Sequence, residues 1–176
     1  MTELEKFTLR DFASIIVEVE GRPNAEKVFN QLKGLSARGL MHPIPDHYGV
    51  KGALLFPKIE LFWARILMAA IDMGLSSDNL AKLAQDLTEK NVLQSALDDL
   101  AKPDHDNWLI EISWIRIPGE ESASVYGNWV RGNHRFRPGA NPLDADSYTV
   151  TGAIEGALSI RFGAIALPIL AYENRS

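Results

Sequence analysis

The sequence has no cysteine among its 176 residues. This absence excludes disulfide bonds, thiolate chemistry and zinc sites built on cysteine ligands. There is also no run of about 18 consecutive apolar residues, the length that a membrane-spanning helix needs. The start of the chain carries three acidic side chains up to Asp11 and no apolar signal-peptide core. We therefore expect a cytoplasmic protein with no membrane partner.

Motifs of known catalytic sites are missing as well. The chain has no nucleophile elbow, phosphate-cradling glycine loop, dinucleotide fingerprint or metalloprotease helix. His42, Asp46 and His47 come close in sequence, but they fall in a predicted loop without a third firm metal ligand. The acidic and histidine residues at 104–106 are better explained as a polar linker. We predict a protein that is not an enzyme and has no cofactor and no metal.

The net charge of −5 at pH 7 argues mildly against a nucleic-acid partner. The charge is unevenly distributed, however. Between Arg22 and Arg65 the chain has seven basic and three acidic side chains, a local sum of +4, and acidic stretches flank this segment. Because phosphate contacts come from one face of a protein, the basic segment is compatible with nucleic-acid binding. A mixed, solvated surface is the alternative explanation.

Apolar residues at helical spacing predict two short helices near the N-terminus. Thr8 can cap the first helix, and Asn24 can cap the second, which ends near Gly39. Residues 41–57 contain three prolines and two glycines, so they cannot be helical. They predict a loop or small hairpin with its tip at residues 49–52.

Three further helices are predicted in the first part of the chain. The third begins at Pro57 and carries a broad apolar face, the fourth is capped by Ser76 or Ser77, and a short fifth covers residues 91–101. The polar run at residues 102–107 is the best domain boundary.

After Asn107 the pattern changes to strands separated by glycine and proline. A hairpin turn is expected at residues 155–156, and the tail at 164–171 is left open between a strand and a short helix. Pro168 argues against a central strand there. The predicted strands cover residues 108–117, 124–130, 148–154 and 157–162. The fold class is α+β, with a winged helix-turn-helix domain at residues 1–101 and a small β-rich domain at residues 107–176.

The helix–helix–hairpin–helix order is the plan of a winged helix-turn-helix unit, which places its second helix in the major groove of DNA. Asparagine and glutamine there can bond adenine edges, and lysine can bind guanine or phosphate. The start of that helix also favours phosphate. Arg10 and Arg65 are further candidates, although Arg65 can instead be an internal ion-pair partner. The candidate DNA contacts are Arg22, Asn24, Lys27, Asn30, Gln31, Lys33, Arg38, His42, Lys51 and Lys58.

Three segments resemble MerR-type transcriptional regulators. FTLRDFA at residues 7–13 resembles their opening helix, ARGLMHP at 37–43 their GL-x-P signature, and residues 54–83 their wing-to-helix segment. The resemblance covers roughly the first half of the chain. The break between the first two helices is longer here, and the arginine–tyrosine pair of the family's recognition helix is absent. The resemblance implies a dimeric, double-stranded-DNA-binding winged helix, and it does not imply a metal or drug sensor.

The C-terminal domain is expected to dimerise, sense a small molecule or contact a protein effector. Its loop carries four basic residues that can bind phosphate or another anion, or can simply be solvated: Arg131, His134, Arg135 and Arg137. Two other functions remain open for the chain. One is a protein-interaction or assembly factor on a winged-helix scaffold, since fold does not fix function. The other is a small-ligand-binding protein that uses the C-terminal domain.

Overall fold

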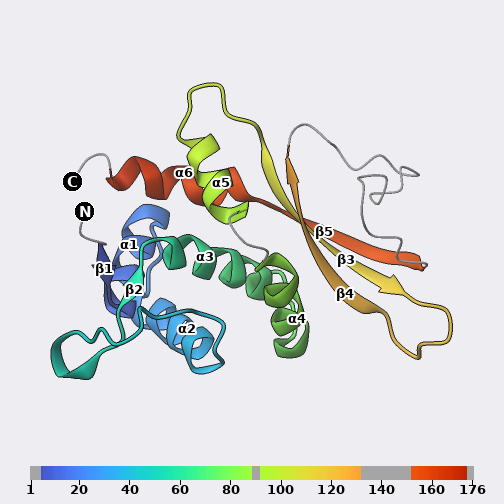
Figure 1. Ribbon diagram of the computed structural model, residues 1–176, viewed down its shortest axis with the longest axis horizontal. Coiled ribbons are helices and arrows are strands. Elements are labelled where there is room, and N and C mark those ends of the chain that lie inside the picture. Colours follow the sequence, from blue (N-terminus) through green and yellow to red (C-terminus); the bar gives the residue numbers. More distant parts are fainter. Residues whose placement is uncertain (1–4, 89–91, 132–151, 174–176) are drawn as a thin grey trace.

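The computed structural model describes residues 5–88, 92–131 and 152–173. The chain is a mixed α+β protein in which helices form the N-terminal part and a three-stranded sheet follows (Figure 1). The predicted fold class is confirmed at this level. None of the helices in the described ranges combines the length and the apolar character that crossing a membrane requires.

The first two helices form where the apolar spacing predicts them. A short strand, β1 (Lys6–Phe7), leads into α1 (Leu9–Glu20). Thr8 and Asp11 form a capping box, in which the Thr8 N–H donates to the Asp11 carboxylate at 2.7 Å. The helix ends at Gly21, whose φ of 61° is left-handed and therefore favours glycine. Helix α2 (Ala25–Ala37) follows after a short turn and packs against α1.

Residues 41–57 form the predicted hairpin. Tyr48 and Leu54 make an antiparallel bridge, and the Ile44 N–H donates to the Leu55 carbonyl at 2.7 Å. The tip is a single 3-10 turn, η1 (Val50–Gly52). The returning strand β2 (Phe56–Pro57) pairs with β1, so the hairpin root is fixed to the start of the chain.

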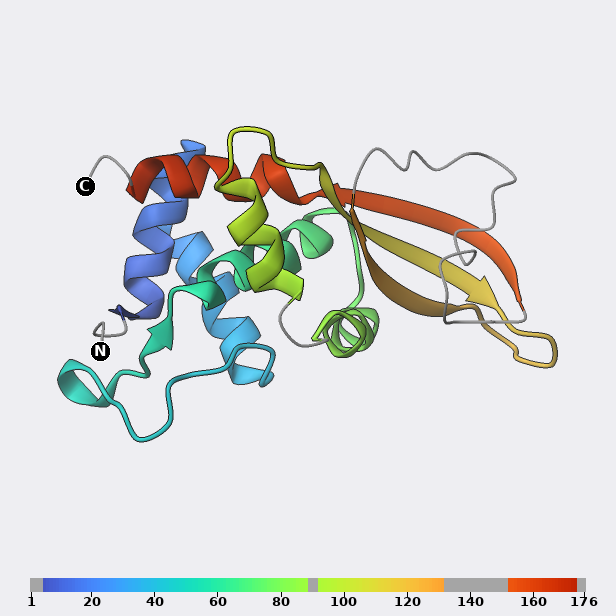
Figure 2. The same cartoon turned by 45° about the horizontal axis from the view of Figure 1, so that its top comes forward.

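Three more helices complete the N-terminal part. Helix α3 (Ile59–Asp72) lies at its centre and is buried on nearly all sides (Figure 2). Helix α4 (Ser77–Leu87) is capped by the Ser76 hydroxyl, and α5 (Val92–Leu100) follows it. These spans agree with the predicted third, fourth and fifth helices.

The sheet has β3 (Trp108–Arg116) at its centre, between β4 (Ser124–Arg131) and β5 (Ala153–Arg161), and all pairs are antiparallel. Helix α4 packs on β4. Gly127 permits this close approach, because a Cβ atom there would lie 2.4 Å from a Leu83 methyl carbon.

The predicted hairpin turn at residues 155–156 is wrong. Strand β5 runs through both residues, and Gly156 lies opposite Trp114 in the ladder. The register shifts between Trp114 and Ile115, whose partners are Gly156 and Ile154, so Glu155 is the extra residue of a β-bulge. Gly156, which predicts a turn in the sequence, therefore lies next to a β-bulge within a strand. Of the strand predicted at residues 148–154, residues 148–151 lie outside the described residues, and β5 includes residues 153 and 154.

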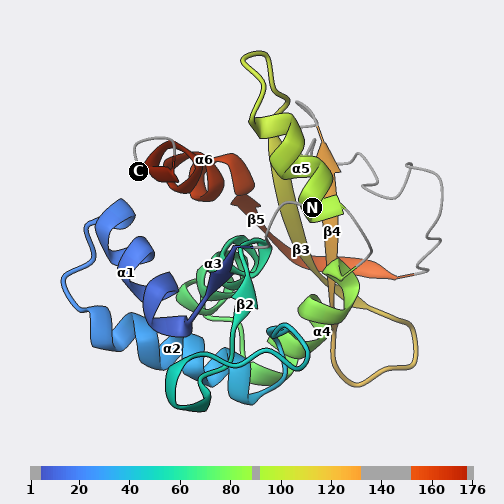
Figure 3. The same ribbon diagram turned by 60° about the vertical axis from the view of Figure 1, so that its left-hand side comes forward.

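The C-terminal tail is the helix α6 (Phe162–Glu173), despite its internal Pro168. It crosses back over the helical part and contacts α1, α3 and α5 (Figure 3). The Tyr172 hydroxyl donates to the Glu18 carboxylate of α1 at 3.0 Å. Buried residues of the helices, the sheet and α6 form one continuous hydrophobic cluster. The two parts of the described chain thus share a core.

Asp99 joins the end of α5 to the sheet. Its side chain is 9% exposed, and it accepts the Trp108 indole N–H at 2.9 Å and the Asp106 backbone N–H at 3.2 Å. Lys102 and Arg131 lie 3.4 and 3.5 Å from the same carboxylate. The Trp108 hydrogen bond is the largest of the interactions that hold the pKa of Asp99 below its ordinary value.

This lowered pKa makes the stability dependent on acid pH. The ionised Asp99 stabilises the fold above its unfolded-state pKa of about 3.9, and this contribution is lost as the pH falls through the lower folded pKa. Asp99→Asn should therefore lower the free energy of unfolding at neutral pH, and this free energy should fall less steeply at acid pH than in the wild type. Urea unfolding at a series of pH values measures this, with exposed Asp98→Asn as the matched control. An unchanged fall at acid pH in Asp99→Asn would contradict the assignment.

Candidate nucleic-acid interface

Helix α2 presents one polar face to solvent and one apolar face to the core. Lys27, Asn30 and Lys33 are exposed, and their spacing of three residues places them on the same side of the helix. Val28 and Leu32, on the opposite side, are buried against the rest of the molecule. The three exposed residues form what we call the α2 stripe. They are free to meet a partner that approaches from outside.

Gln31 lies between the polar and apolar faces of α2. It is half-buried, and its amide oxygen Oε1 is buried with no hydrogen-bond partner among the described residues. An unsatisfied buried amide is costly and calls for an explanation. Gln31 therefore does not share the free exposure of the α2 stripe.

Asn24 and Arg22, at the start of α2, already have internal partners. The Asn24 side-chain oxygen caps the helix by accepting the Lys27 backbone N–H at 2.9 Å. The Arg22 guanidinium pairs with Glu20 at 2.6 Å and Asp72 at 3.3 Å. Its side chain is only 24% exposed. Both residues hold the turn between α1 and α2 in place.

Arg65 is an internal ion-pair partner and not a surface cation, which is the second of the two roles predicted for it from the sequence. The residue is 6% exposed, and its Nε donates to the Glu20 carboxylate. Its Nη1 is buried with no hydrogen-bond partner among the described residues. Glu20 thus receives two arginines, one from α3 and one from the turn before α2. The other additional candidate, Arg10, is exposed and lies 4.4 Å above the Phe29 ring.

The hairpin tip is both basic and apolar. Lys51 is exposed, with a left-handed φ of 58°. Beside it, Val50 is 85% exposed and Tyr48 65% exposed. Sequence reasoning found Lys51 but missed the two apolar residues. Their exposure could have been predicted from their position, because a segment this rich in glycine and proline forms a loop at the surface.

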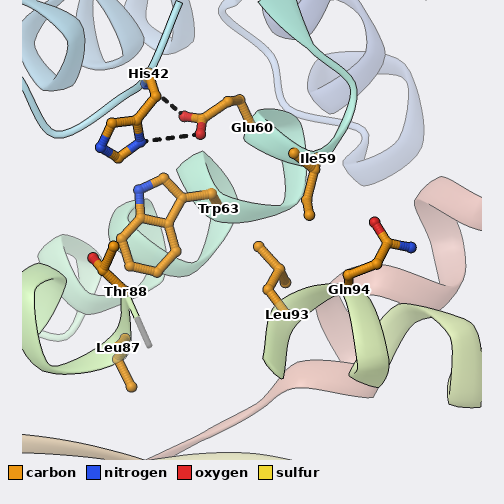
Figure 4. Close-up of a pocket in the computed structure, with 8 residues that line it drawn as sticks. All are labelled: His42, Ile59, Glu60, Trp63, Leu87, Thr88, Leu93 and Gln94. Atoms are coloured by element: carbon orange, nitrogen blue, oxygen red, sulfur yellow. Dashed lines mark hydrogen bonds and ion pairs between the residues drawn. The ribbon is translucent and has the colours of Figure 1, made fainter. Parts of the chain in front are cut away.

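At the hairpin root, His42 is bound to Glu60 of α3 (Figure 4). The Glu60 carboxylate accepts the His42 backbone N–H at 2.9 Å and lies 3.2 Å from its ring Nδ1. Burial raises the pKa of the Glu60 carboxyl, against the lowering effect of His42. Glu60 was not predicted from sequence, because a lone acidic residue in an apolar helix gives no hint of its partner.

The other two basic candidates lie near the same root. Arg38 is exposed and donates to the Ser77 hydroxyl at 3.1 Å. Lys58 lies 3.8 Å from the Glu5 carboxylate. Arg38 is thus joined to the start of α4, and Lys58 to the segment before β1.

Helix α2 and the hairpin lie side by side, at the end of the molecule away from the three-stranded sheet (Figures 1 and 3). The α2 stripe is therefore not covered by the sheet. Lys27, Asn30 and Lys33 are thus exposed on α2, and the exposed His42 and Lys51 belong to the neighbouring hairpin.

The basic loop of the C-terminal part is described only at its first residue. Arg131 lies 2.8 Å from Asp106 and 5.7 Å above the Trp108 ring, and it also approaches Asp99. Its charge is thus shared with two carboxylates. His134, Arg135 and Arg137 lie outside the described residues. Within the described ranges, no three histidine or acidic side chains cluster so as to hold a metal ion.

The chain is thus an α+β protein with an exposed polar helix beside a hairpin whose tip carries Lys51. No protein-family model matches this sequence, and no curated protein matches it. The functional assignment therefore depends on the geometry and chemistry of this surface.

Proposed function

We propose that this chain is a sequence-specific regulator that binds double-stranded DNA through a MerR-like winged helix-turn-helix. In this proposal α2 is the recognition helix and residues 41–57 are the wing. The observation that carries it is the α2 stripe of Lys27, Asn30 and Lys33, which is exposed on a helix that lies beside the hairpin and away from the sheet. A helix of 13 residues is about 20 Å long, and the major groove admits such a helix.

The chemistry of the stripe fits base and phosphate contacts. The Asn30 carboxamide can bond the N6 and N7 edge of adenine, while Lys27 and Lys33 can reach guanine or phosphate. Lys51 at the hairpin tip adds a cation that can approach the DNA backbone. Because the whole chain is acidic, binding should depend on this one face and fall steeply with salt.

Two copies are proposed to bind together. One recognition helix contacts few base pairs, and dimers read half-sites that are about 34 Å apart.

The test is a salt-dependent shift assay with the full chain on genomic duplex fragments. Lys27→Ala and Lys33→Ala should each weaken binding to all fragments and reduce the salt slope by about 0.9 per lost phosphate contact. Asn30→Ala should instead change the preference between fragments, by about 1–3 kcal/mol. Lys82→Ala on α4, an exposed lysine of another helix, is the matched control. The absence of measurable duplex affinity at low salt would refute the proposal.

A second candidate is a protein-interaction factor built on the same scaffold. The observation that favours it is the apolar hairpin tip, where Val50 and Tyr48 are largely exposed. Aromatic and apolar tips are typical of protein contacts. Under this alternative, Val50→Asp should abolish partner binding while Lys27→Ala leaves it unchanged.

A further inference from the structure

A cavity of about 150 Å³ lies between the hairpin root, α3, the end of α4 and the start of α5 (Figure 4). Its walls are mostly apolar and include Ile59 and Trp63 of α3, Leu87 of α4 and Leu93 of α5. The pocket is partly open to solvent, and its volume is about that of an enclosed cavity that holds a single six-membered ring. The pocket therefore has room for a small planar molecule.

One end of the cavity is a buried carboxylate. Glu60 is 7% exposed, and His42 supplies both of its hydrogen-bond partners in the described part of the chain. The described residues give Glu60 no lysine or arginine ion pair, and the charge of its histidine partner depends on protonation. A buried carboxylate of this kind is stabilised by a permanent cation.

The Thr88, Gln94 and Trp63 side chains each donate a hydrogen bond to a group outside the cavity lining. The Thr88 hydroxyl donates to the Ala84 carbonyl, and the Gln94 amide donates to Asp98 at 2.7 Å. The Trp63 indole N–H donates to the Leu40 carbonyl at 2.7 Å, which fixes the ring. What remains at these residues is acceptor oxygen, the second N–H of the Gln94 amide and the aromatic face of Trp63. A ligand that complements such groups is a hydrogen-bond donor with positive charge.

We propose that this cavity binds a small organic cation with a planar apolar body, such as an arylamidinium or arylammonium ion. The cationic N–H groups pair with the Glu60 carboxylate, as an arginine fork does. The ring lies against Trp63 and the aliphatic walls. Neither the α2 stripe nor the C-terminal loop takes part in this site.

The test uses the full chain without DNA and three probes of the same shape. Benzamidine carries the positive charge, benzamide is neutral and benzoate is negative. Calorimetry measures affinity, and the Trp63 indole N–H resonance, assigned through Trp63→Phe, reports the location. We expect benzamidine to bind at least about tenfold more tightly than benzamide, and benzoate not to bind. Equal binding of benzamidine and benzamide, no binding of any probe, or binding that leaves the Trp63 signal unmoved would overturn the proposal.

A variant pair tests the role of Glu60. Glu60→Gln keeps an acceptor for His42 but removes the charge, so it should lose at least about tenfold in benzamidine affinity. Glu121→Gln, an exposed acid in the turn after β3, should bind like the wild type. If Glu60→Gln does not fold, the three probes on the unaltered chain still decide the question. Wild-type affinity in a folded Glu60→Gln would contradict the site.

The consequence for regulation rests on the proposed DNA-binding function. A cation at Glu60 competes with the His42 ring, and His42 lies at the root of the proposed wing. Saturating benzamidine should therefore shift duplex affinity in wild type and not in Glu60→Gln. Since ligand binding is measured without DNA, a failed cation site and a failed DNA-binding proposal give different results.

Discussion

Replacing Glu20 with alanine is expected to lower the free energy of unfolding by about 3 kcal/mol. The change leaves Arg65, which is 6% exposed, as a buried cation without its carboxylate. Breaking a buried ion pair costs about 3–5 kcal/mol, and we expect the lower end because the Glu20 side chain is 22% exposed. Arg22 also loses its nearer partner and keeps Asp72. Denaturant unfolding followed by circular dichroism measures the effect.

The double variant Glu20→Met with Arg65→Leu separates the ion pair from the rest of the turn. Removing both charges and filling the space with apolar atoms should recover most of the lost stability. Glu26→Ala, an exposed acid on α2, serves as the control and should change stability by less than about 0.5 kcal/mol. A double variant as unstable as Glu20→Ala would show that packing at Glu20, rather than the unpaired Arg65, causes the loss. If the recovered variant binds duplex DNA more weakly, the ion pair also positions α2.

Replacing Phe162 with alanine should cost about 3–5 kcal/mol, as large-to-small changes of buried aromatics do. The ring is fully buried at the start of α6, and its centroid lies 5.2 Å from that of Trp129 in an edge-on arrangement. Because helices, sheet and α6 share one core, the loss should destabilise all of them together. In a Trp63→Phe background, in which the remaining tryptophans lie in β3 and β4, tryptophan emission reports the sheet, and far-ultraviolet circular dichroism reports the helices.

The two signals should therefore change at the same denaturant concentration in Phe162→Ala and in the wild type. Leu167→Ala, a partly exposed residue of the same helix, is the matched control and should cost much less. Two separate transitions, with only the tryptophan signal shifted in Phe162→Ala, would show that the helical part folds independently of α6.

Local signals in the sequence predict much of the fold. Thr8 and Asn24 cap the helices that they were expected to cap, because a cap depends on residues only two or three positions away. The same helical spacing correctly separates exposed Lys27 and Lys33 from buried Leu32. These features need no information from distant parts of the chain.

Contacts between distant residues could not be predicted in this way. The pairs Glu20–Arg65 and His42–Glu60 are 45 and 18 residues apart, so nothing in the local sequence names the partner. The bulge at Glu155 is set by its pairing with β3, and Gly156 alone resembles a turn signal. The tail could be a strand or a helix until α1, α3 and α5 provide the surface that α6 covers. The same holds for part of the candidate site, since Arg22 forms an ion pair with Asp72, which is distant in the sequence.

The return of α6 over α1 has a consequence for synthesis on the ribosome. The α6 residues that cover the N-terminal helices are made after all the other described elements, and Tyr172 meets Glu18 across 154 positions. Domains usually complete folding as soon as they emerge, starting from the N-terminus. Until α6 has been made, part of the apolar surface of α1 stays uncovered. Nascent chains stalled before residue 162 should therefore recruit chaperones, and chains extended until α6 has left the ribosome should lose that association.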